Sequence, residues 1–338
     1  MPAVIRDKFG RPIRDLRMAV IDKCNFRCPY CMPAEIFGAD YNFLSKNELL
    51  SDNEIVRLAR LFAQAGVTKF RITGGEPLLR PNLPDMIARL ARIPNIEDLA
   101  MTTNAAYLVD YAPALKAAGL YRVTVSLDSL DNEVFQRMNG RRGTVEQVLA
   151  GIEAAKSAGF SNIKINCVVK KGVNDHTIVE MARFFKDSGH IIRFIEYMDV
   201  GNLNGWKMDD VVTASEILQM IDAAMPLEPL DPNYRGEVAR RYRYLDGSGE
   251  IGLITSVTQP FCGDCTRARL SGAGEYYTCL FAQGGTDLRA PLRRGASDEE
   301  ILALITGVWQ NRTDRYSELR TSFTDIPVKG AEMYRIGG

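Results

Sequence analysis

Two groups of three cysteines are the most reactive feature of this 338-residue sequence. Cys24, Cys28 and Cys31 lie in the segment DKCNFRCPYCMP with the spacing C-x3-C-x2-C. Three thiolates on one short loop can hold three corners of a cubane iron–sulfur cluster and leave the fourth iron open. Structural zinc usually takes four ligands, and the two histidines, His176 and His190, are distant in sequence. The first group therefore favours a 4Fe–4S cluster over zinc.

The second group is Cys262, Cys265 and Cys279, with the spacing C-x2-C-x13-C. C-x2-C also occurs in zinc knuckles, so these residue types leave a zinc site open. The alternative is a second cluster whose open iron binds substrate. The seventh cysteine, Cys167, lies inside the apolar segment KINCVV, and we expect it to be a small buried side chain rather than a ligand.

Several lysines and arginines lie within predicted strands: Arg17, Lys69, Arg71, Lys164, Arg267 and Arg269. Lys69 and Arg71 are two residues apart, so they share one face of a strand, as Arg267 and Arg269 do. A cation inside a buried strand needs a partner. That partner is either a structural carboxylate or a bound phosphate, which arginine can hold through two hydrogen bonds.

The elements that position these residues alternate between helix and strand. Four helical stretches end at Gly66, Gly119, Gly159 and Gly189, and each is followed by a β-branched or aromatic run. Glycine suits the left-handed position after a helix. With strands near 17–22 and 98–103, the pattern predicts six β/α units up to about Met198 and hence a parallel sheet. A partial barrel and an open doubly wound sheet both remain open.

Local signals support these elements. Ser51 and Glu54 read as a capping box, followed by an apolar stripe. In a barrel-like fold the active site lies at the carboxyl ends of the strands, so one set of residues should ring one mouth. These are Gly74–Glu76, Thr102–Asn104, Ser126, Asp128, Asn166, Glu196 and Met198.

The pattern changes near residue 211, which predicts two domains, 1–210 and 211–338. The second should be a smaller α+β extension with a helix over 214–223 and antiparallel strands around the turn Asp246–Gly249. A final helix should begin after the N-cap Ser297 and run to about Gln310. The tail from about Ser322 to Gly338 is expected to be irregular.

Bulk properties restrict the function classes. Lysine plus arginine equal aspartate plus glutamate, 42 against 42, which argues against a nucleic-acid coat or a polybasic membrane binder. No apolar run reaches the roughly 18 residues that span a bilayer, and the start lacks a signal-peptide core. We therefore expect a cytoplasmic enzyme with no membrane or nucleic-acid partner.

Taken together, these motifs resemble the GTP 3′,8-cyclase family, which belongs to the radical S-adenosylmethionine (SAM) superfamily and starts molybdenum cofactor biosynthesis. The resemblance spans nearly the whole chain. Its segments are LRMAVIDKCNFRCPYCMP, FRITGGEPLLR, MTTNA, VSLDSL, IEYMDVG, FCGDCTRARL and the terminal Gly337–Gly338. Gly74–Pro77 alone would be a common turn, but it follows the strand KFRIT in register with the cysteines.

The resemblance implies an α/β fold with an incomplete (β/α)6 TIM-like barrel, closed at its mouth by the C-terminal extension. It implies two 4Fe–4S clusters, one held by each cysteine group. It implies SAM contacts from Tyr30, Gly75, Ser126 and Met198. It also implies a set of GTP contacts, of which Arg17, Arg267 and Arg269 are catalytic. That set is Arg17, Arg71, Thr102, Lys164, Arg267, Ala268 and Arg269.

The reaction that the resemblance implies is reductive cleavage of SAM to methionine and a 5′-deoxyadenosyl radical, which takes the C3′ hydrogen of GTP. C3′ then attacks C8, and reduction gives 3′,8-cyclo-7,8-dihydro-GTP. The implied partners are an external electron donor, the downstream cyclic pyranopterin monophosphate synthase and a second copy in a homodimer. Gly337–Gly338 would enter the active site. Two rival hypotheses are a peptide-modifying radical enzyme and a zinc- or iron–sulfur-based sensor.

Overall fold

Six parallel strands form the centre of the fold, and they lie side by side in the order in which they occur in the chain. The computed structural model describes residues 4–201, 203–320 and 330–337. The six strands are β1 (Asp15–Ala19), β2 (Lys69–Thr73), β3 (Asp98–Thr103), β4 (Arg122–Ser126), β5 (Lys164–Val169) and β6 (Ile191–Glu196). A doubly wound sheet reverses its strand order at a switch point. The sequential order therefore excludes that alternative.

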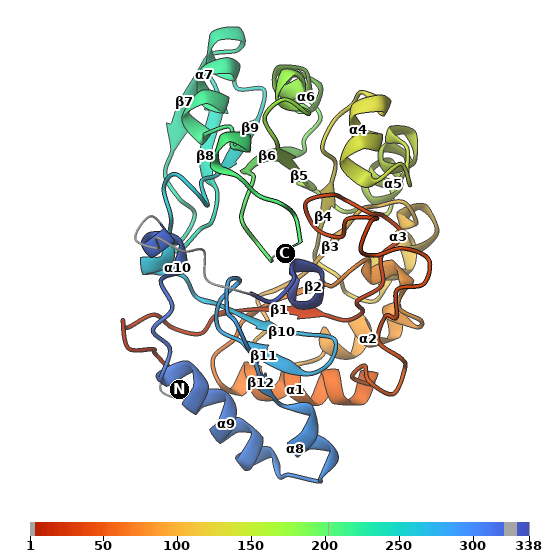
Figure 1. Ribbon diagram of the computed structural model, residues 1–338, viewed down its shortest axis with the longest axis vertical. Coiled ribbons are helices and arrows are strands. Elements are labelled where there is room, and N and C mark those ends of the chain that lie inside the picture. The colour runs from red at the N-terminus through yellow and green to blue at the C-terminus, as the bar shows by residue number, and fades with distance from the viewer. Residues whose placement is uncertain (1–3, 202, 321–329, 338) are drawn as a thin grey trace.

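Helices connect successive strands and follow the outer side of the curved sheet (Figure 1). They are α1 (Asp52–Gln64), α2 (Leu83–Leu90), α3 (Leu108–Ala117), α4 (Asn132–Asn139), α5 (Val145–Ser157) and α6 (Ile178–Phe185). Two short 3-10 turns, η1 (Pro77–Leu79) and η2 (Asp175–Thr177), precede α2 and α6. The predicted β/α alternation is confirmed.

The C-terminal strands extend the same sheet at both edges. At one edge β9 (Glu250–Ile254) pairs in parallel with β6, followed by antiparallel β8 (Arg240–Tyr244) and β7 (Leu227–Leu230). At the other edge β10 (Arg267–Leu270) pairs in parallel with β1, followed by β11 (Glu275–Tyr277) and β12 (Thr286–Asp287). The predicted antiparallel pair around 246–249 is confirmed. The extension continues the central sheet rather than adding a layer of its own.

The remaining helices and turns also belong to the C-terminal part. They are η3 (Met208–Asp210), α7 (Ala214–Ala224), η4 (Cys262–Asp264), α8 (Arg289–Arg293), α9 (Asp298–Gln310), α10 (Tyr316–Leu319) and α11 (Met333–Ile336). Helix α9 begins after Ser297, as predicted. The tail is not wholly irregular, because α11 packs against β1. Gly338 lies outside the described residues.

The predicted local signals are present. Ser51 and Glu54 form the capping box of α1, whose apolar stripe is buried. Gly66, Gly119 and Gly159 have positive φ just after their helices. The first strand differs from expectation, since it ends at Ala19 rather than running to residue 22. The backbone after Ala19 instead pairs with the loop after β2, as described below.

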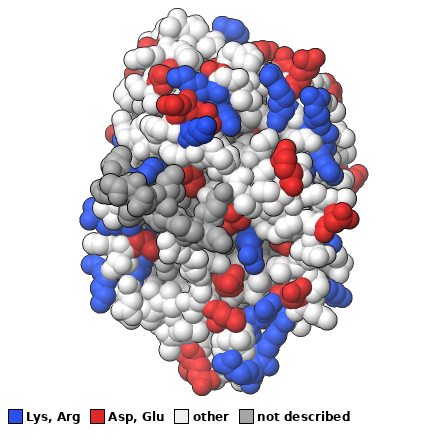
Figure 2. All heavy atoms as spheres, viewed as in Figure 1, with Lys and Arg blue, Asp and Glu red and all other residues white. Residues whose placement is uncertain are grey.

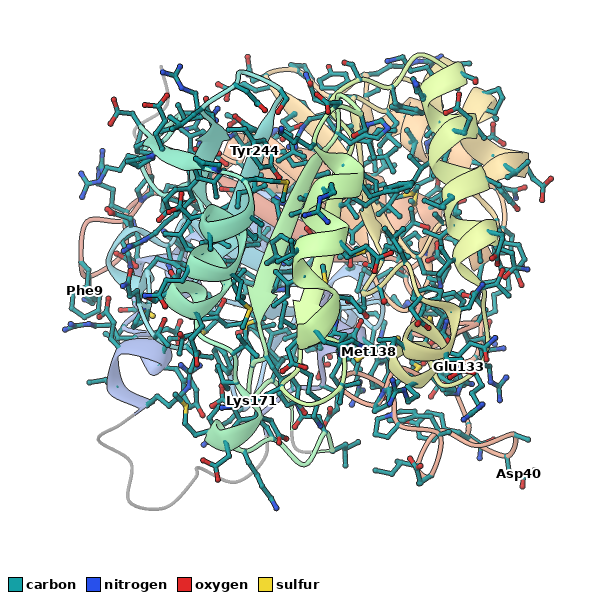
Figure 3. The ribbon with its side chains drawn as sticks, turned by 90° about the horizontal axis from the view of Figure 1, so that it is seen from above. Phe9, Asp40, Glu133, Met138, Lys171 and Tyr244 are labelled. Atoms are coloured by element: carbon teal, nitrogen blue, oxygen red, sulfur yellow. The ribbon has the colours of Figure 1, made fainter. Side chains whose placement is uncertain are left out.

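The apolar core lies between the sheet and its outer helices. Tyr244 of β8 (labelled in Figure 3) is 2% exposed, and its hydroxyl donates to the carbonyl of Ala182 in α6 at 3.1 Å. Figure 2 shows Lys and Arg interspersed with Asp and Glu over one face of the molecule. In the described part of the chain, no helix combines the length and apolarity that crossing a membrane would need.

Candidate active site between the two cysteine groups

The first cysteine group lines a hollow at the carboxyl ends of the parallel strands. Cys24, Cys28 and Cys31 share this hollow with all four residues expected to contact SAM, namely Tyr30, Gly75, Ser126 and Met198. A turn in which the amides of Cys31 and Met32 both donate to the carbonyl of Cys28, at 2.9 and 2.7 Å, shapes the loop. The structure therefore brings together residues from four separate segments of the chain.

The glycines after β2 allow that loop to lie directly against the cysteine loop. The amide of Gly75 donates to the carbonyl of Ile21 at 2.8 Å, and the amide of Glu76 donates to the carbonyl of Lys23 at 2.8 Å. A Cβ at Gly74 or Gly75 would collide with these same carbonyls. Only glycine permits this approach.

Two buried carboxylates support this hollow, and other groups already occupy both. Glu76 accepts from the amides of Leu78 and Asn104 and from the hydroxyl of Thr103. Asp128 accepts from the hydroxyl of Tyr30 at 2.8 Å and from the amide of Val168 at 2.9 Å.

Burial raises the pKa of both Glu76 and Asp128 to about 7. Both carboxylates are thus engaged by donors of the protein, and the three thiols lie in the same hollow as candidate iron ligands.

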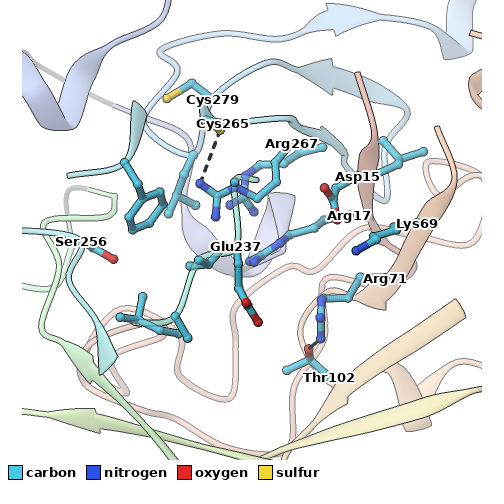
Figure 4. A pocket seen from close by; sticks show the side chains of 18 of the residues that line it. Asp15, Arg17, Lys69, Arg71, Thr102, Glu237, Ser256, Cys265, Arg267 and Cys279 are labelled. Atoms are coloured by element: carbon cyan, nitrogen blue, oxygen red, sulfur yellow. Dashed lines mark hydrogen bonds between the residues drawn. The ribbon is translucent and has the colours of Figure 1, made fainter. Parts of the chain in front are cut away.

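A second hollow lies inside the curve of the sheet and is strongly cationic. Nine Lys and Arg side chains line it, against four Asp and Glu. The cations are Arg17, Lys69, Arg71, Arg122, Lys164, Arg193, Arg267, Arg269 and Arg312. Lys69 and Lys164 are the first residues of their strands, so this hollow reaches deeper than the carboxyl ends at which the whole site was expected. Figure 4 shows Arg17, Lys69, Arg71 and Arg267 around it.

Three arginines lie in one row across neighbouring parallel strands. Arg17 of β1 is in register with Arg269 of β10 on one side and with Arg71 of β2 on the other. Arg71 donates to the hydroxyls of Thr102 and Thr124, both at 3.1 Å. Among the described residues, none of these three guanidinium groups forms an ion pair with a carboxylate. The row therefore presents unneutralised positive charge.

Burial and mutual repulsion both act on these cations. Burial, then Arg269 and Arg71, lowers the pKa of Arg17. Burial, then Arg193 and Arg122, lowers the pKa of Lys164 to about 8. A polyanion in the hollow would relieve this repulsion, as a triphosphate does.

The C-terminal cysteines line the same cationic hollow. Cys265 and Cys279 appear on one side of it in Figure 4. Arg267 and Arg312 donate to the sulfur of Cys265 at 3.4 and 3.3 Å. Burial opposes ionisation of this thiol, but the charges of Arg267 and Arg312 outweigh it and lower its pKa to about 6. The surroundings of Cys265 therefore favour its thiolate form, whereas burial raises the pKa of Cys24 to about 12 and that of Cys279 to about 11.

The donor set fits iron–sulfur clusters in both places. Backbone amides donate to two further sulfurs, from Phe26 to Cys24 and from Phe281 to Cys279, both at 3.4 Å. Such hydrogen bonds stabilise thiolate ligands of clusters. Among the described residues, no group of three or more His, Cys, Asp or Glu side chains surrounds the position of a single metal ion. A cubane is larger than one ion and holds its ligands further apart.

The two hollows meet. Thr102, Asn166, Ile195 and Met198 line both of them. The C-terminal segment also reaches this region, because Arg269 donates to the carbonyl of Gly337 and a Cβ at Gly337 would collide with Thr73. Gly337 thus lies beside Arg269 of the cationic hollow and Thr73 of the first hollow, whereas Gly338 is outside the described residues.

Two expected residues, Ala268 and Glu196, are structural, and two residues that line the cationic hollow, Arg193 and Arg312, were not expected. Ala268 is fully buried in the apolar core and does not line the hollow, although Arg267 and Arg269 on either side of it do. Glu196 touches the first hollow but accepts from the amides of Ala214 and Val257, which makes it a structural group. Arg193 was missed, although its alternation in IIRFIE was a usable signal. Arg312 was also missed, and nothing local in the sequence identifies it.

Comparison with known proteins gives the family. Residues 18–185 match the Radical SAM superfamily, and residues 190–318 match the family Molybdenum Cofactor Synthesis C. A GTP 3′,8-cyclase from Acidothermus cellulolyticus is 55% identical over 329 residues, 96% of this chain and 91% of the relative. The chain belongs to the GTP 3′,8-cyclase family. Another family member, from Staphylococcus haemolyticus, is 51% identical over 341 residues and all of both chains.

A solved structure supports the fold beyond the family. Streptococcus suis SuiB bound to precursor peptide SuiA has a TM-score of 0.62 and 14% identity, covering 94% of this chain and 69% of that one. At this identity the likeness concerns the fold alone.

Proposed function

We propose that this protein converts GTP to (8S)-3′,8-cyclo-7,8-dihydroguanosine 5′-triphosphate, the first step of molybdenum cofactor biosynthesis. The observation that carries the proposal is the junction of the two hollows. A three-cysteine hollow with the SAM residues opens, through four shared residues, onto a cationic hollow with its own three cysteines. Relatives 50–55% identical over nearly their whole length bear the name of this activity.

The proposed cofactors are one 4Fe–4S cluster on Cys24, Cys28 and Cys31, a second on Cys262, Cys265 and Cys279, and SAM in the first hollow. When bound, the first cluster and SAM supply a 5′-deoxyadenosyl radical, with one electron from an external donor. Tyr30, Gly75, Ser126 and Met198 line the volume in which SAM would lie. The Tyr30 hydroxyl is fixed by Asp128.

The cationic hollow would bind GTP through its triphosphate. Arg17, Arg71, Thr102 and Lys164 line one side of it, and Arg267 and Arg269 line the side near the second cysteine group. The backbone of Ala268 joins the last two. Arginine and lysine neutralise phosphate oxygens well. In the part of the chain that the structure describes, Arg17, Arg71 and Arg269 form no ion pair with a carboxylate, which leaves them available to phosphate. Arg267 and Arg269 follow Cys265 closely in sequence, and Arg17 is in register with Arg269. These three are the proposed catalytic residues, as the family resemblance implies.

The finer architecture and partners belong to the same proposal. Residues 1–210 form an incomplete (β/α)6 barrel, and residues 211–338 close its mouth. Enclosure suits the chemistry, because a primary carbon radical must be kept from water and from side reactions. The protein works in the cytoplasm, as a homodimer, and passes its product to cyclic pyranopterin monophosphate synthase. Gly337–Gly338 forms part of the active site.

The decisive experiment follows a deuterium atom. The anaerobically reconstituted, reduced protein is incubated with SAM and GTP deuterated at C3′. We expect deuterium in 5′-deoxyadenosine and a cyclised nucleotide triphosphate. If 5′-deoxyadenosine forms without deuterium and no nucleotide is cyclised, GTP is not the substrate. About two zinc ions and little iron per chain would instead favour the zinc sensor.

A variant pair tests the assigned binding residues. Arg71→Ala removes a cation whose side chain donates to two threonine hydroxyls and, among the described residues, forms no ion pair. It should weaken GTP binding at least tenfold while slow, uncoupled SAM cleavage continues. Arg243→Ala is the matched control, because the Arg243 side chain is exposed at the surface and paired with Glu228. Equal losses of GTP binding and SAM cleavage in Arg71→Ala would contradict the assignment.

A further inference from the structure

A network of four charged side chains lies behind the C-terminal cysteines. Asp7 and Arg11 precede β1, whereas Arg312 and Asp314 follow α9. The side chains of Asp7, Arg11 and Arg312 are at most 3% exposed. Arg11 donates to Asp7 at 2.6 Å, and Arg312 bridges Asp7 and Asp314 at 3.5 and 3.3 Å. Charges buried so deeply are costly unless they are paired, as these are.

The network holds all three cysteine positions. Arg11 donates to the carbonyl of Cys262 at 2.7 Å, and Arg312 donates to the carbonyl of Cys265 at 2.7 Å. Asp314 accepts from the hydroxyl of Thr278 at 2.6 Å, one residue before Cys279. Two segments 300 residues apart in the chain thus fix the loops that carry the second cysteine group.

Arg312 is the member that also reaches a sulfur. One terminal nitrogen donates to the carbonyl of Cys265, and the other donates to its Sγ at 3.3 Å. The guanidinium lies over the ring of Trp309, 4.5 Å from its centroid. Arg267 also approaches this sulfur, at 3.4 Å, and both arginines border the hollow, but of the two only Arg312 is ion-paired with carboxylates among the described residues. Arg312 is packed and ion-paired, so its charge stays beside the sulfur whether or not substrate is bound.

We propose that Arg312 is a positioning residue that sets the reduction potential of the C-terminal cluster. The inference rests on the proposed cluster at Cys262, Cys265 and Cys279. In one-electron reduction an electron from a low-potential donor enters the cluster, and no bond forms or breaks. The reduced cluster is more negative, so a fixed cation and an N–H donor at the ligand sulfur stabilise it over the oxidised cluster.

The test measures potential rather than turnover. In full-length protein carrying Cys24→Ala, Cys28→Ala and Cys31→Ala, only the C-terminal cluster remains, and its midpoint is measured by a dithionite titration followed by electron paramagnetic resonance. Arg312→Gln should lower the equilibrium constant for reduction about tenfold, which is ~59 mV for one electron. Asp314→Asn removes a negative charge from the same network and should shift the midpoint upward.

The opposite signs of the two shifts separate a charge effect from a general loosening of the site, because loosening that exposes the cluster to water would move both midpoints in the same direction. Exposed Arg243→Gln is the matched control and should leave the midpoint unchanged. An unshifted midpoint in Arg312→Gln with full iron overturns the inference. If Arg312→Gln loses iron, Arg312→Lys and Asp314→Asn decide. A near-native midpoint in Arg312→Lys together with a raised midpoint in Asp314→Asn supports the inference. Any other pair of midpoints overturns it.

Iron and sulfide analysis of the same background protein separates the two proposals. A full cluster with an unchanged midpoint defeats only the role of Arg312. If this protein, with its N-terminal cysteines removed, binds zinc and no cluster, the proposed cofactor set itself is wrong.

Discussion

Lys164 offers the sharpest test of the proposed triphosphate site. It begins β5, lines the cationic hollow, and is surrounded by arginines. Burial, then the charges of Arg193 and Arg122, lowers its pKa from the ordinary 10.5 to about 8. In the free protein Lys164 is therefore mostly charged at pH 7 and about nine-tenths neutral at pH 9. A bound triphosphate would restore the charge, so binding takes up a proton above pH 8.

Titration of Lys164 should change the Kd for GTP by a predictable amount. The apparent Kd for GTP should rise about tenfold from pH 7 to pH 9, because about a tenth of the free protein still carries the charge. At pH 7, Lys164→Gln loses a charge-assisted contact of about 2 kcal/mol, or roughly 30-fold in Kd. At pH 9 that penalty should shrink to about threefold, since Lys164 is largely neutral there in the unaltered protein as well.

Calorimetric titration of the reconstituted protein with GTP, without SAM, measures these values at pH 7, 8 and 9. Lys164→Arg is the control, because arginine keeps its charge throughout this range. Its Kd should therefore change much less with pH. If the Kd of Lys164→Arg for GTP changes with pH as it does in the unaltered protein, titration of Lys164 is not the cause of the pH dependence. A flat curve for the unaltered protein would refute the proposed titration equally.

Two further variants probe the first hollow. Gly75→Ala would push a methyl group into the carbonyl of Lys23. It should weaken SAM binding at least tenfold, seen as loss of the SAM-induced change in the spectrum of the reduced N-terminal cluster, with C-terminal iron retained. Burial raises the pKa of Asp128 to about 7, so the folded protein holds an extra proton between about pH 4 and pH 7 and its stability falls as pH rises through that range. Asp128→Asn should reduce this slope by up to ~1.4 kcal/mol per pH unit in urea unfolding, and an unchanged slope would contradict that account.

The sequence predicted the features that depend on neighbouring residues. The capping box at Ser51 and the helix-ending glycine Gly66 are local signals, and both are present in the structure. Strand alternation alone predicted that Lys69 and Arg71 lie on the same face of their strand. The structure agrees, because Phe70 between them is 1% exposed and part of the core on the opposite face. Such features need no knowledge of the tertiary fold.

Long-range pairing was beyond the sequence pattern. Nothing local indicates that β10 lies beside β1, some 250 residues earlier in the chain. Arg312 illustrates the same limit. It follows a helix and belongs to no strand, so its role is visible only from its contact with Cys265 in the folded structure. Arg193 is different: it alternates in its strand as Lys164 does, so a stricter use of the same rule would have included it.

The pairing of β10 with β1 explains why both cysteine groups can serve one substrate. It places Arg269, Arg17 and Arg71 in one row, on strands about 4.8 Å apart. Two unit charges about 5 Å apart repel by about 3 kcal/mol at an effective dielectric constant near 20, and the charges of Arg269 and Arg71 lower the pKa of Arg17. A fold that only needed stability would place carboxylates or apolar side chains there. The arrangement becomes favourable when a polyanion bridges the row. Repulsion among the arginines lowers the stability of the ligand-free protein, and binding of a triphosphate removes that repulsion.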